Sequence, residues 1–180
     1  MSEITAFELL SEIRAKAVAL ASQTTSYSIQ SAGIKNIAYV VNGVNFFCDA
    51  EDVREVSTSY NIMPVPQTKR WMRGLFNSKG VLYSVTDLSL FAGFDRAVQE
   101  NRGHLLLLAD IDKQSALLVN RVIGFRYFEN NKIIDDIDRN QELPDGLSSF
   151  VSEAYYIDDE HWYRLDIARL LQSEQFREVQ

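Results

Sequence analysis

Residues 62–88 restrict the fold more than any other stretch of this sequence. They contain two of the chain's three prolines, Pro64 and Pro66. Because each proline ring fixes φ and disfavours helix in the residue before it, we expect residues 63–66 to form a stiff, extended run. A long helix is therefore not expected in the middle of the chain.

The residues that follow the prolines predict a β-hairpin. We expect a short helical turn over residues 68–72, ended by Gly74, and then a brief buried strand at residues 75–76. The polar sequence Asn-Ser-Lys-Gly at residues 77–80 is typical of a turn, since its glycine accepts a positive φ. Apolar and polar side chains then alternate through residues 81–88 with the period of a strand.

Further strands are predicted along most of the chain. The two-residue period recurs at residues 37–41, and short runs predict strands at residues 44–48, 115–119, 122–128, 150–157 and 161–167. Residues 104–110 are a continuous apolar run, which fits a strand covered on both faces. Asn42-Gly43, between the first two, is a strong signal for a tight hairpin. Short helical patterns also occur at residues 88–91 and, near the C-terminus, at residues 168–176. Many short strands with little helix and no fixed-period repeat indicate a mainly β fold, built as two small barrels or as one larger barrel.

The chain begins with a pattern of a different kind. Over residues 4–22, apolar side chains recur at helical spacing behind a capping box, which predicts an amphipathic helix. A polar linker at residues 23–31 follows, so we expect residues 1–34 to be helix and linker and residues 35–180 to be the β domain. Docking of the helix on its own domain and binding of a partner both remain open.

Composition excludes several classes of function. The 180-residue chain has a net charge of −7 and no cluster of lysine and arginine, so neither nucleic acid nor an anionic membrane surface is an expected partner. Its single cysteine, Cys48, cannot form an internal disulfide and argues against a structural zinc site. The sequence shows no signal-peptide pattern and no apolar run near the roughly 20 residues of a membrane span, so we expect a cytoplasmic protein without direct membrane insertion.

The residue types that usually build active sites form no recognisable constellation. His104 begins an apolar strand and His161 lies beside a tryptophan, so both are interpreted as structural or surface histidines. Residues 130–146 are rich in carboxylates but lack the alternating ligand spacing of a calcium loop. The glycines at positions 74 and 80 lack the spacing of a phosphate loop. We therefore predict no catalytic residue, no cofactor and no metal site.

Short motifs in and before the central stretch resemble a known signature. They are Pro-Val-Pro at residues 64–66 with an aromatic residue after it, Arg-Gly-Leu at 73–75, Asn-x-Lys-Gly at 77–80, Val-Thr-Asp-Leu at 85–88 and, upstream, Val-Arg-Glu-Val at 53–56. Together they resemble the signature of CheW-like domains, the coupling proteins of bacterial chemosensory arrays. The resemblance extends, with decreasing strength, from about residue 35 to about residue 171.

The resemblance implies both a fold and a function. CheW-like domains pair two small five-stranded, SH3-like β-barrels around a shared apolar interface, here with an added N-terminal amphipathic helix and a short C-terminal helix. They are non-catalytic adaptors that join the cytoplasmic tip of a chemoreceptor to the regulatory domain of a CheA-like histidine kinase, at membrane-associated arrays. The N-terminal helix is similar to the PilI branch of the family, which serves type IV pilus twitching motility.

The resemblance also points to a set of partner-binding residues. They are Val53, Glu55, Val56 and Ile62 as groove or kinase-facing positions, and Asn77, Lys79 and Gly80 as the signature turn. Gly80, Val85 and Asp87 have an alternative role, which is only to hold the turn and strand in shape. The family commonly has arginine where this chain has Lys79, and lysine does not reproduce a bidentate guanidinium contact.

Two other classes of function stay open on the residues alone. One is a non-signalling tandem-barrel module that binds a peptide or another protein, because small barrels leave edge strands and grooves that suit such partners. The other is an enzyme with an unfamiliar site.

Overall fold

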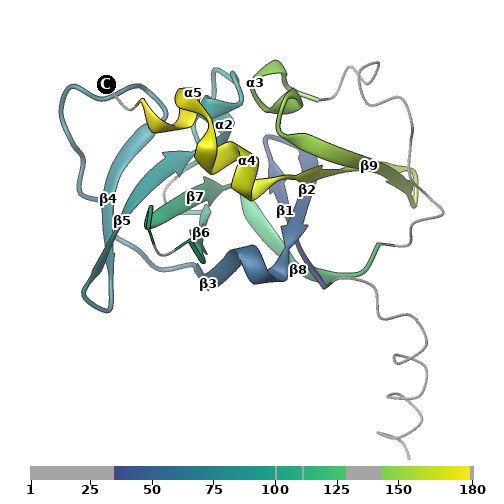
Figure 1. Ribbon diagram of the computed structural model, residues 1–180, viewed down its shortest axis with the longest axis horizontal. Helices are drawn as coiled ribbons and strands as arrows, with labels where there is room; N and C mark the ends of the chain where they lie inside the picture. Colours follow the sequence, from purple (N-terminus) through teal and green to yellow (C-terminus); the bar gives the residue numbers. More distant parts are fainter. Residues whose placement is uncertain (1–34, 100, 111, 129–142, 179–180) are drawn as a thin grey trace, which may run out of the picture. The chain divides into compact units, whose positions relative to one another are not determined.

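Two five-stranded sheets form the framework of the described part of the chain (Figure 1). The computed structural model describes residues 35–99, 101–110, 112–128 and 143–178. The predicted N-terminal helix at residues 4–22, the linker after it and most of the polar loop at 130–146 lie outside the described residues.

Sheet A has the strand order β8-β1-β2-β10-β9. Its strands are β1 (Asn36–Val41), β2 (Val44–Asp49), β8 (Arg121–Arg126), β9 (Val151–Ile157) and β10 (Glu160–Leu165). The hairpin predicted at Asn42-Gly43 joins β1 to β2, and both turn residues have a positive φ, 47° and 91°. Because β10 pairs with β2 in parallel, segments far apart in the sequence complete the sheet together.

Sheet B has the strand order β3-β6-β7-β5-β4. Its strands are β3 (Val53–Ser57), β4 (Met72–Ser78), β5 (Val81–Asp87), β6 (His104–Leu108) and β7 (Ser115–Val119). All of them lie between β2 and β8 in the sequence, so sheet B is inserted within the segments that form sheet A. The mainly β architecture with two five-stranded sheets, implied by the family resemblance, is confirmed.

Short helices connect and follow the strands. They are the 3-10 helix η1 (Ala50–Asp52), α2 (Leu88–Phe91), α3 (Asp145–Ser148), α4 (Ile167–Gln172) and α5 (Glu174–Arg177). The helical turn predicted at residues 88–91 is confirmed as α2. The prediction of one helix over residues 168–176 is wrong: Ser173 has extended backbone and its hydroxyl accepts from the Phe176 N–H, which starts a second helix. Within the described residues, no helix is long and apolar enough to cross a membrane.

The helical turn predicted at residues 68–72 is also wrong, because β4 begins at Met72 and continues through Gly74. Gly74 has a φ of 137° at a register shift between β4 and β5. Beside it, Met63 and Leu75 exchange two backbone hydrogen bonds of 2.8 Å, and a Cβ atom at position 74 would collide with the Met63 carbonyl. The chain after β3 therefore returns to β4 and joins the two ends of sheet B.

Successive side chains along a strand point to opposite faces of the sheet, so the apolar residues of one strand pack into different cores. In β6, Leu106 and Leu108 face a core shared by the two sheets, whereas Leu105 and Leu107 face a second core within sheet B. All four are at most 1% exposed, so the prediction of a strand covered on both faces is confirmed. A third core, around Trp162, belongs to sheet A. At about 1.5–3 kcal/mol for each large side chain, burial in the shared core holds the sheets together.

The C-terminal helices attach the end of the chain to sheet B, over which Figure 1 shows them in yellow. The Phe176 ring of α5 lies 6.1 Å from the Trp71 ring and 5.5 Å from the Phe91 ring, measured between centroids. In the turn between β6 and β7, Lys113 Nζ donates a 2.8 Å hydrogen bond to the Leu171 carbonyl at the end of α4. This cation therefore satisfies one of the last carbonyls of the helix.

Candidate partner-binding surface

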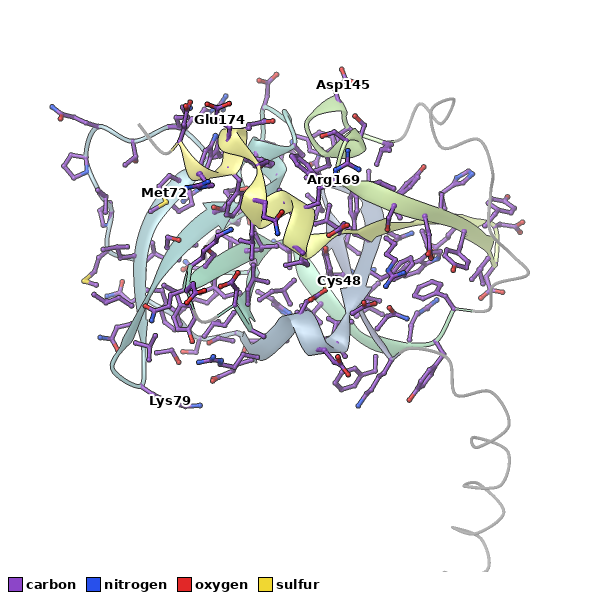
Figure 2. All side chains as sticks on the ribbon, in the orientation of Figure 1. Cys48, Met72, Lys79, Asp145, Arg169 and Glu174 are labelled. Carbon is purple, nitrogen blue, oxygen red and sulfur yellow. The ribbon has the colours of Figure 1, made fainter. Side chains whose placement is uncertain are left out.

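The tip of the β4–β5 hairpin is a two-residue turn made by Lys79 and Gly80. Both residues have a positive φ, 52° and 86°, as the tight turns that match the twist of paired strands require. The Asn77 side-chain oxygen accepts a 3.0 Å hydrogen bond from the Gly80 N–H. Asn77 and Gly80 therefore shape the turn and aim Lys79 outward, and Figure 2 shows Lys79 at the hairpin tip.

Lys79 connects the hairpin to β3, an edge strand of sheet B. Its Nζ lies 2.8 Å from Glu55 Oε2, and the side chains of Lys79 and Glu55 are 80% and 36% exposed. Residues from two motifs of the sequence thus meet in an exposed ion pair. Where the family commonly has arginine, this chain makes a single-point contact with lysine.

An open hollow of about 620 Å³ lies next to this ion pair. We define the hairpin-edge surface by the residues that line the hollow: Glu55, Ser57, Ser59, Tyr60, Asn61, Met63, Phe76, Asn77, Ser78 and Lys79. Its apolar part is formed by Tyr60 and Phe76, whose rings contact edge to face at 6.4 Å, and by Met63, which is 47% exposed. Polar and charged side chains complete the lining.

The other predicted partner-binding residues lie outside this lining. Val56, on β3, is 38% exposed. Val53 packs against the shared core, and Ile62 packs against the core of sheet B. Glu55, Asn77, Lys79 and Gly80 are thus brought together, whereas Val53 and Ile62 anchor the backbone around them.

Sequence reasoning did not single out Tyr60, Met63 or Phe76 as surface-forming residues. Their place in the hollow depends on the backbone pairing of Met63 with Leu75, which is not readable from a strand period. One signal was available, since residues 63–66 were expected to be extended and extended chain can pair with a neighbouring strand.

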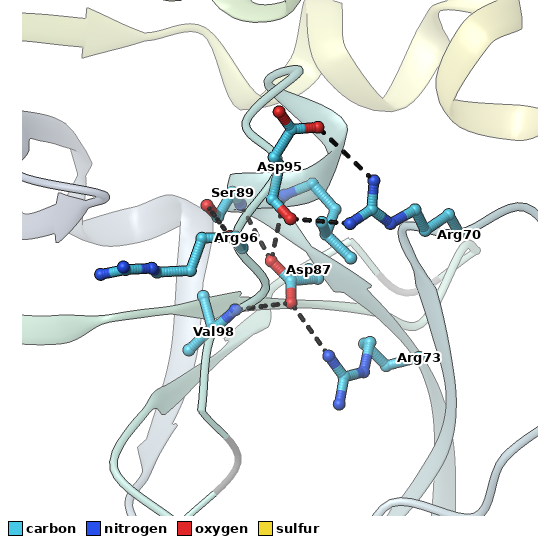
Figure 3. Close-up of polar contacts among 8 residues, drawn as sticks. Arg70, Arg73, Asp87, Ser89, Asp95, Arg96 and Val98 are labelled. Atoms are coloured by element: carbon cyan, nitrogen blue, oxygen red, sulfur yellow. Dashed lines mark hydrogen bonds and ion pairs between the residues drawn. The ribbon is translucent and has the colours of Figure 1, made fainter.

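A buried carboxylate, Asp87, holds the other end of the hairpin (Figure 3). Its Oδ1 accepts from the N–H groups of Ser89 and Leu90 at 3.1 and 3.2 Å and so caps α2. Its Oδ2 accepts from the Val98 N–H at 2.9 Å and from Arg73 Nη1 at 3.3 Å. Burial raises the pKa of Asp87, while these backbone N–H groups and the Arg73 guanidinium oppose the rise. Asp87 is placed to fix the structure and not to meet a partner.

The groups that could do acid–base or nucleophilic chemistry have structural surroundings. Burial raises the pKa of the Cys48 thiol, with Asp52 and Asp49 adding to the rise, which opposes formation of the reactive thiolate. His104 Nδ1 accepts a 3.0 Å hydrogen bond from the Val122 N–H and so holds β8 beside β6. Among the residues that the structure describes, no group of three or more His, Cys, Asp or Glu side chains is placed to hold a metal ion.

A comparison with models of protein families places this chain in one family. The model described as "CheW-like domain" matches residues 37–175, a range that includes all the motifs of the central stretch and both sheets except for Asn36. This chain belongs to the CheW-like domain family. The family consists of non-catalytic scaffold proteins of chemotactic signalling.

Two known proteins are similar to this chain. Protein PilI of Pseudomonas aeruginosa is 26% identical over 129 residues, which cover 71% of this chain and 72% of PilI. In three dimensions the chain is similar to the scaffolding protein TtCheW from Thermoanaerobacter tengcongensis, with a TM-score of 0.67 and 18% identity, over 82% of this chain and 97% of TtCheW. The structural likeness shows that the fold is shared.

Proposed function

We propose that this CheW-like chain is an adaptor that couples the cytoplasmic tip of a chemoreceptor to the regulatory domain of a CheA-like histidine kinase, without catalysis of its own. Its similarity to PilI supports a role in a chemosensory system that controls type IV pilus twitching motility. In this role the adaptor works in the cytoplasm and reaches membrane-associated arrays through its partners.

One observation carries the proposal: two motifs separated in sequence meet on one exposed surface. Glu55 and Lys79 pair at 2.8 Å beside a hollow with an exposed apolar side. Exposed ion pairs contribute only about 0–1 kcal/mol to folding stability. Glu55 and Lys79 can therefore separate and bind groups of a partner with little loss of stability. An apolar floor with a charged rim is the usual anatomy of a protein–protein contact.

We assign different roles to the residues suggested by the motifs. Glu55, Val56 and Lys79 contact the partner, because their side chains reach solvent on the edge strand and at the hairpin tip. The remaining residues hold this surface in shape, through core packing or through the turn: Val53, Ile62, Asn77 and Gly80.

A charge reversal tests the role of the hairpin-edge surface. Glu55→Lys places two lysines together, so we expect at least tenfold weaker binding of the kinase regulatory domain or of the receptor tip, measured by calorimetry with purified fragments. Glu174→Lys, an equal change on the exposed α5, is the matched control and should bind normally. Wild-type binding by a folded Glu55→Lys protein would remove Glu55 from the contact.

The double variant Glu55→Lys/Lys79→Glu separates recognition from structure. It restores an ion pair within the chain but inverts the charges that a partner meets. If the partner recognises the charges, binding stays weak in the double variant. If the pair serves only to fix the hairpin, binding returns. A protein that binds neither kinase nor receptor, but binds an unrelated peptide in the hollow, would instead be a non-signalling tandem-barrel module.

A further inference from the structure

The terminal strand of sheet A carries an exposed apolar row. β8 pairs with β1, and no other described strand pairs with it. Three large side chains on β8 and just after it, Ile123, Phe125 and Tyr127, are 39%, 59% and 63% exposed. The preceding Val122 and the following Phe128 pack against cores, so both ends of the row are anchored.

Local geometry holds this row in place. A register shift in the pairing with β1 leaves Ile123 out of the ladder, and bulges of this kind re-aim side chains at sheet edges. Lys35 Nζ lies 3.6 Å from the centroid of the Phe125 ring, a cation–π contact that restricts the ring. An apolar side chain that is already restricted loses little entropy when a partner covers it.

The charged residues on β8 and just before β1 are all basic, although the whole chain has a net charge of −7. They are Arg121 and Arg126 on β8, and Lys35 just before β1. No carboxylate of the described residues forms an ion pair with Arg121 or Arg126, and Arg126 lies 4.5 Å from the centroid of the Trp162 ring. Two copies joined through β8 would bring like charges together, so a second copy is a poor occupant.

We propose that β8 and its exposed row bind an acidic, amphipathic segment of a second protein. Apolar residues of that segment cover Ile123, Phe125 and Tyr127, and its carboxylates meet Arg121, Arg126 and Lys35. This surface belongs to sheet A, whereas the hairpin-edge surface belongs to sheet B. The inference goes beyond the adaptor function above and does not depend on which partner occupies the hairpin-edge surface.

Photo-crosslinking of the full chain in its native cell identifies the occupant. Tyr127→p-benzoylphenylalanine places the reactive group in the row, and the same replacement of Tyr156, on β9 at the other end of sheet A, is the control. The expected result is an adduct at position 127 and not at 156, which joins a different protein through a segment with carboxylates between apolar residues. Absence of an adduct, an adduct within the same chain or with a second copy, or an adduct with a basic segment would overturn the proposal.

A synthetic peptide of the crosslinked segment then tests the chemistry. Phe125→Ser/Tyr127→Ser in the full chain should weaken peptide binding at least tenfold, while Tyr156→Ser should leave it unchanged. Arg121→Glu/Arg126→Glu should also weaken binding tenfold, and replacing the carboxylates of the peptide by lysines should restore it. If the charge-reversed protein still binds the acidic peptide at wild-type strength, the proposed charge complementarity is wrong. Circular dichroism of each variant confirms that it is folded.

Discussion

Removing the Asp87 carboxylate should destabilise the protein strongly. This side chain is 0% exposed and accepts hydrogen bonds from three backbone N–H groups and from Arg73. Through them it joins the end of β5 to α2 and to the loop at Val98 (Figure 3). Asp87→Ala deletes all these hydrogen-bond acceptors at once.

The magnitude follows from the separate contacts. Loss of the helix cap at Ser89 and Leu90 costs about 1 kcal/mol, as for other Asp-to-Ala changes at caps. The buried Val98 N–H is left unsatisfied, which costs about 1–3 kcal/mol. Arg73 is 23% exposed and can turn to water, so it adds little. The sum of about 2–4 kcal/mol is a large fraction of the roughly 5–15 kcal/mol that stabilises a typical domain.

Asparagine at the same position separates shape from charge. Asp87→Asn keeps the volume and one oxygen for the cap, but its amide group then meets two donors, the Val98 N–H and the Arg73 guanidinium. We expect a loss of about 1–3 kcal/mol. Asp95→Asn is the control, because Asp95 is fully exposed and pairs with Arg70 only at 3.8 Å, so no measurable change is expected.

Urea unfolding followed by circular dichroism and tryptophan fluorescence measures these differences at 25 °C. Asp87→Ala should shift the midpoint with little change in slope, and a loss near 3 kcal/mol corresponds to a melting temperature lowered by about 10 °C. If the free energy of unfolding of Asp87→Ala lies within about 1 kcal/mol of the wild-type value, the buried carboxylate does not hold the hairpin and α2 together.

Two further changes test the same region. Arg73→Gln removes the cation beside Asp87 and should cost about 1–2 kcal/mol at neutral pH. Since burial already raises the folded-state pKa of Asp87, the ionised form is the costly one, and the loss should shrink as the pH falls toward that raised pKa, which unfolding curves across pH will show. Gly74→Ala should cost about 2 kcal/mol or more and speed hydrogen exchange at the Leu75 amide, because the new Cβ meets the Met63 carbonyl. Gly43→Ala, at a positive φ but in open space, should cost less; equal losses would contradict the proposed collision.

Local chemistry made part of the fold predictable. The Asn42-Gly43 turn and the apolar runs of β6 and β7 encode their structure in neighbouring residues, so these elements were predicted correctly. The residues at 68–72 mislead, because Met72 pairs with Thr86 of β5 and the Trp71 carbonyl accepts a hydrogen bond from the Asp87 N–H. The residue types at positions 68–72 do not reveal these contacts with a distant strand.

The candidate surface shows the same division between local and long-range information. The Asn77–Gly80 contact spans three residues, and the motif already suggested a turn there. The Lys79–Glu55 ion pair joins the β4–β5 turn to β3, which is paired with neither β4 nor β5. The family resemblance pointed to both residues but did not show that they touch. The aromatic part of the hollow required the folded chain, since it depends on how β4 meets the segment after β3.

Simultaneous binding of two partners is the most direct test of the adaptor function. The full chain, a kinase regulatory domain and a receptor-tip fragment should be mixed in equal amounts, and the mass of the complex measured by size-exclusion chromatography with light scattering. Contacts of about 800 Å² each would use roughly a tenth of the surface of a small protein, so both partners can bind at once. The adaptor function predicts a ternary complex whose mass is the sum of the three components. If the receptor fragment displaces the kinase domain, so that only binary complexes appear, the chain does not bridge them.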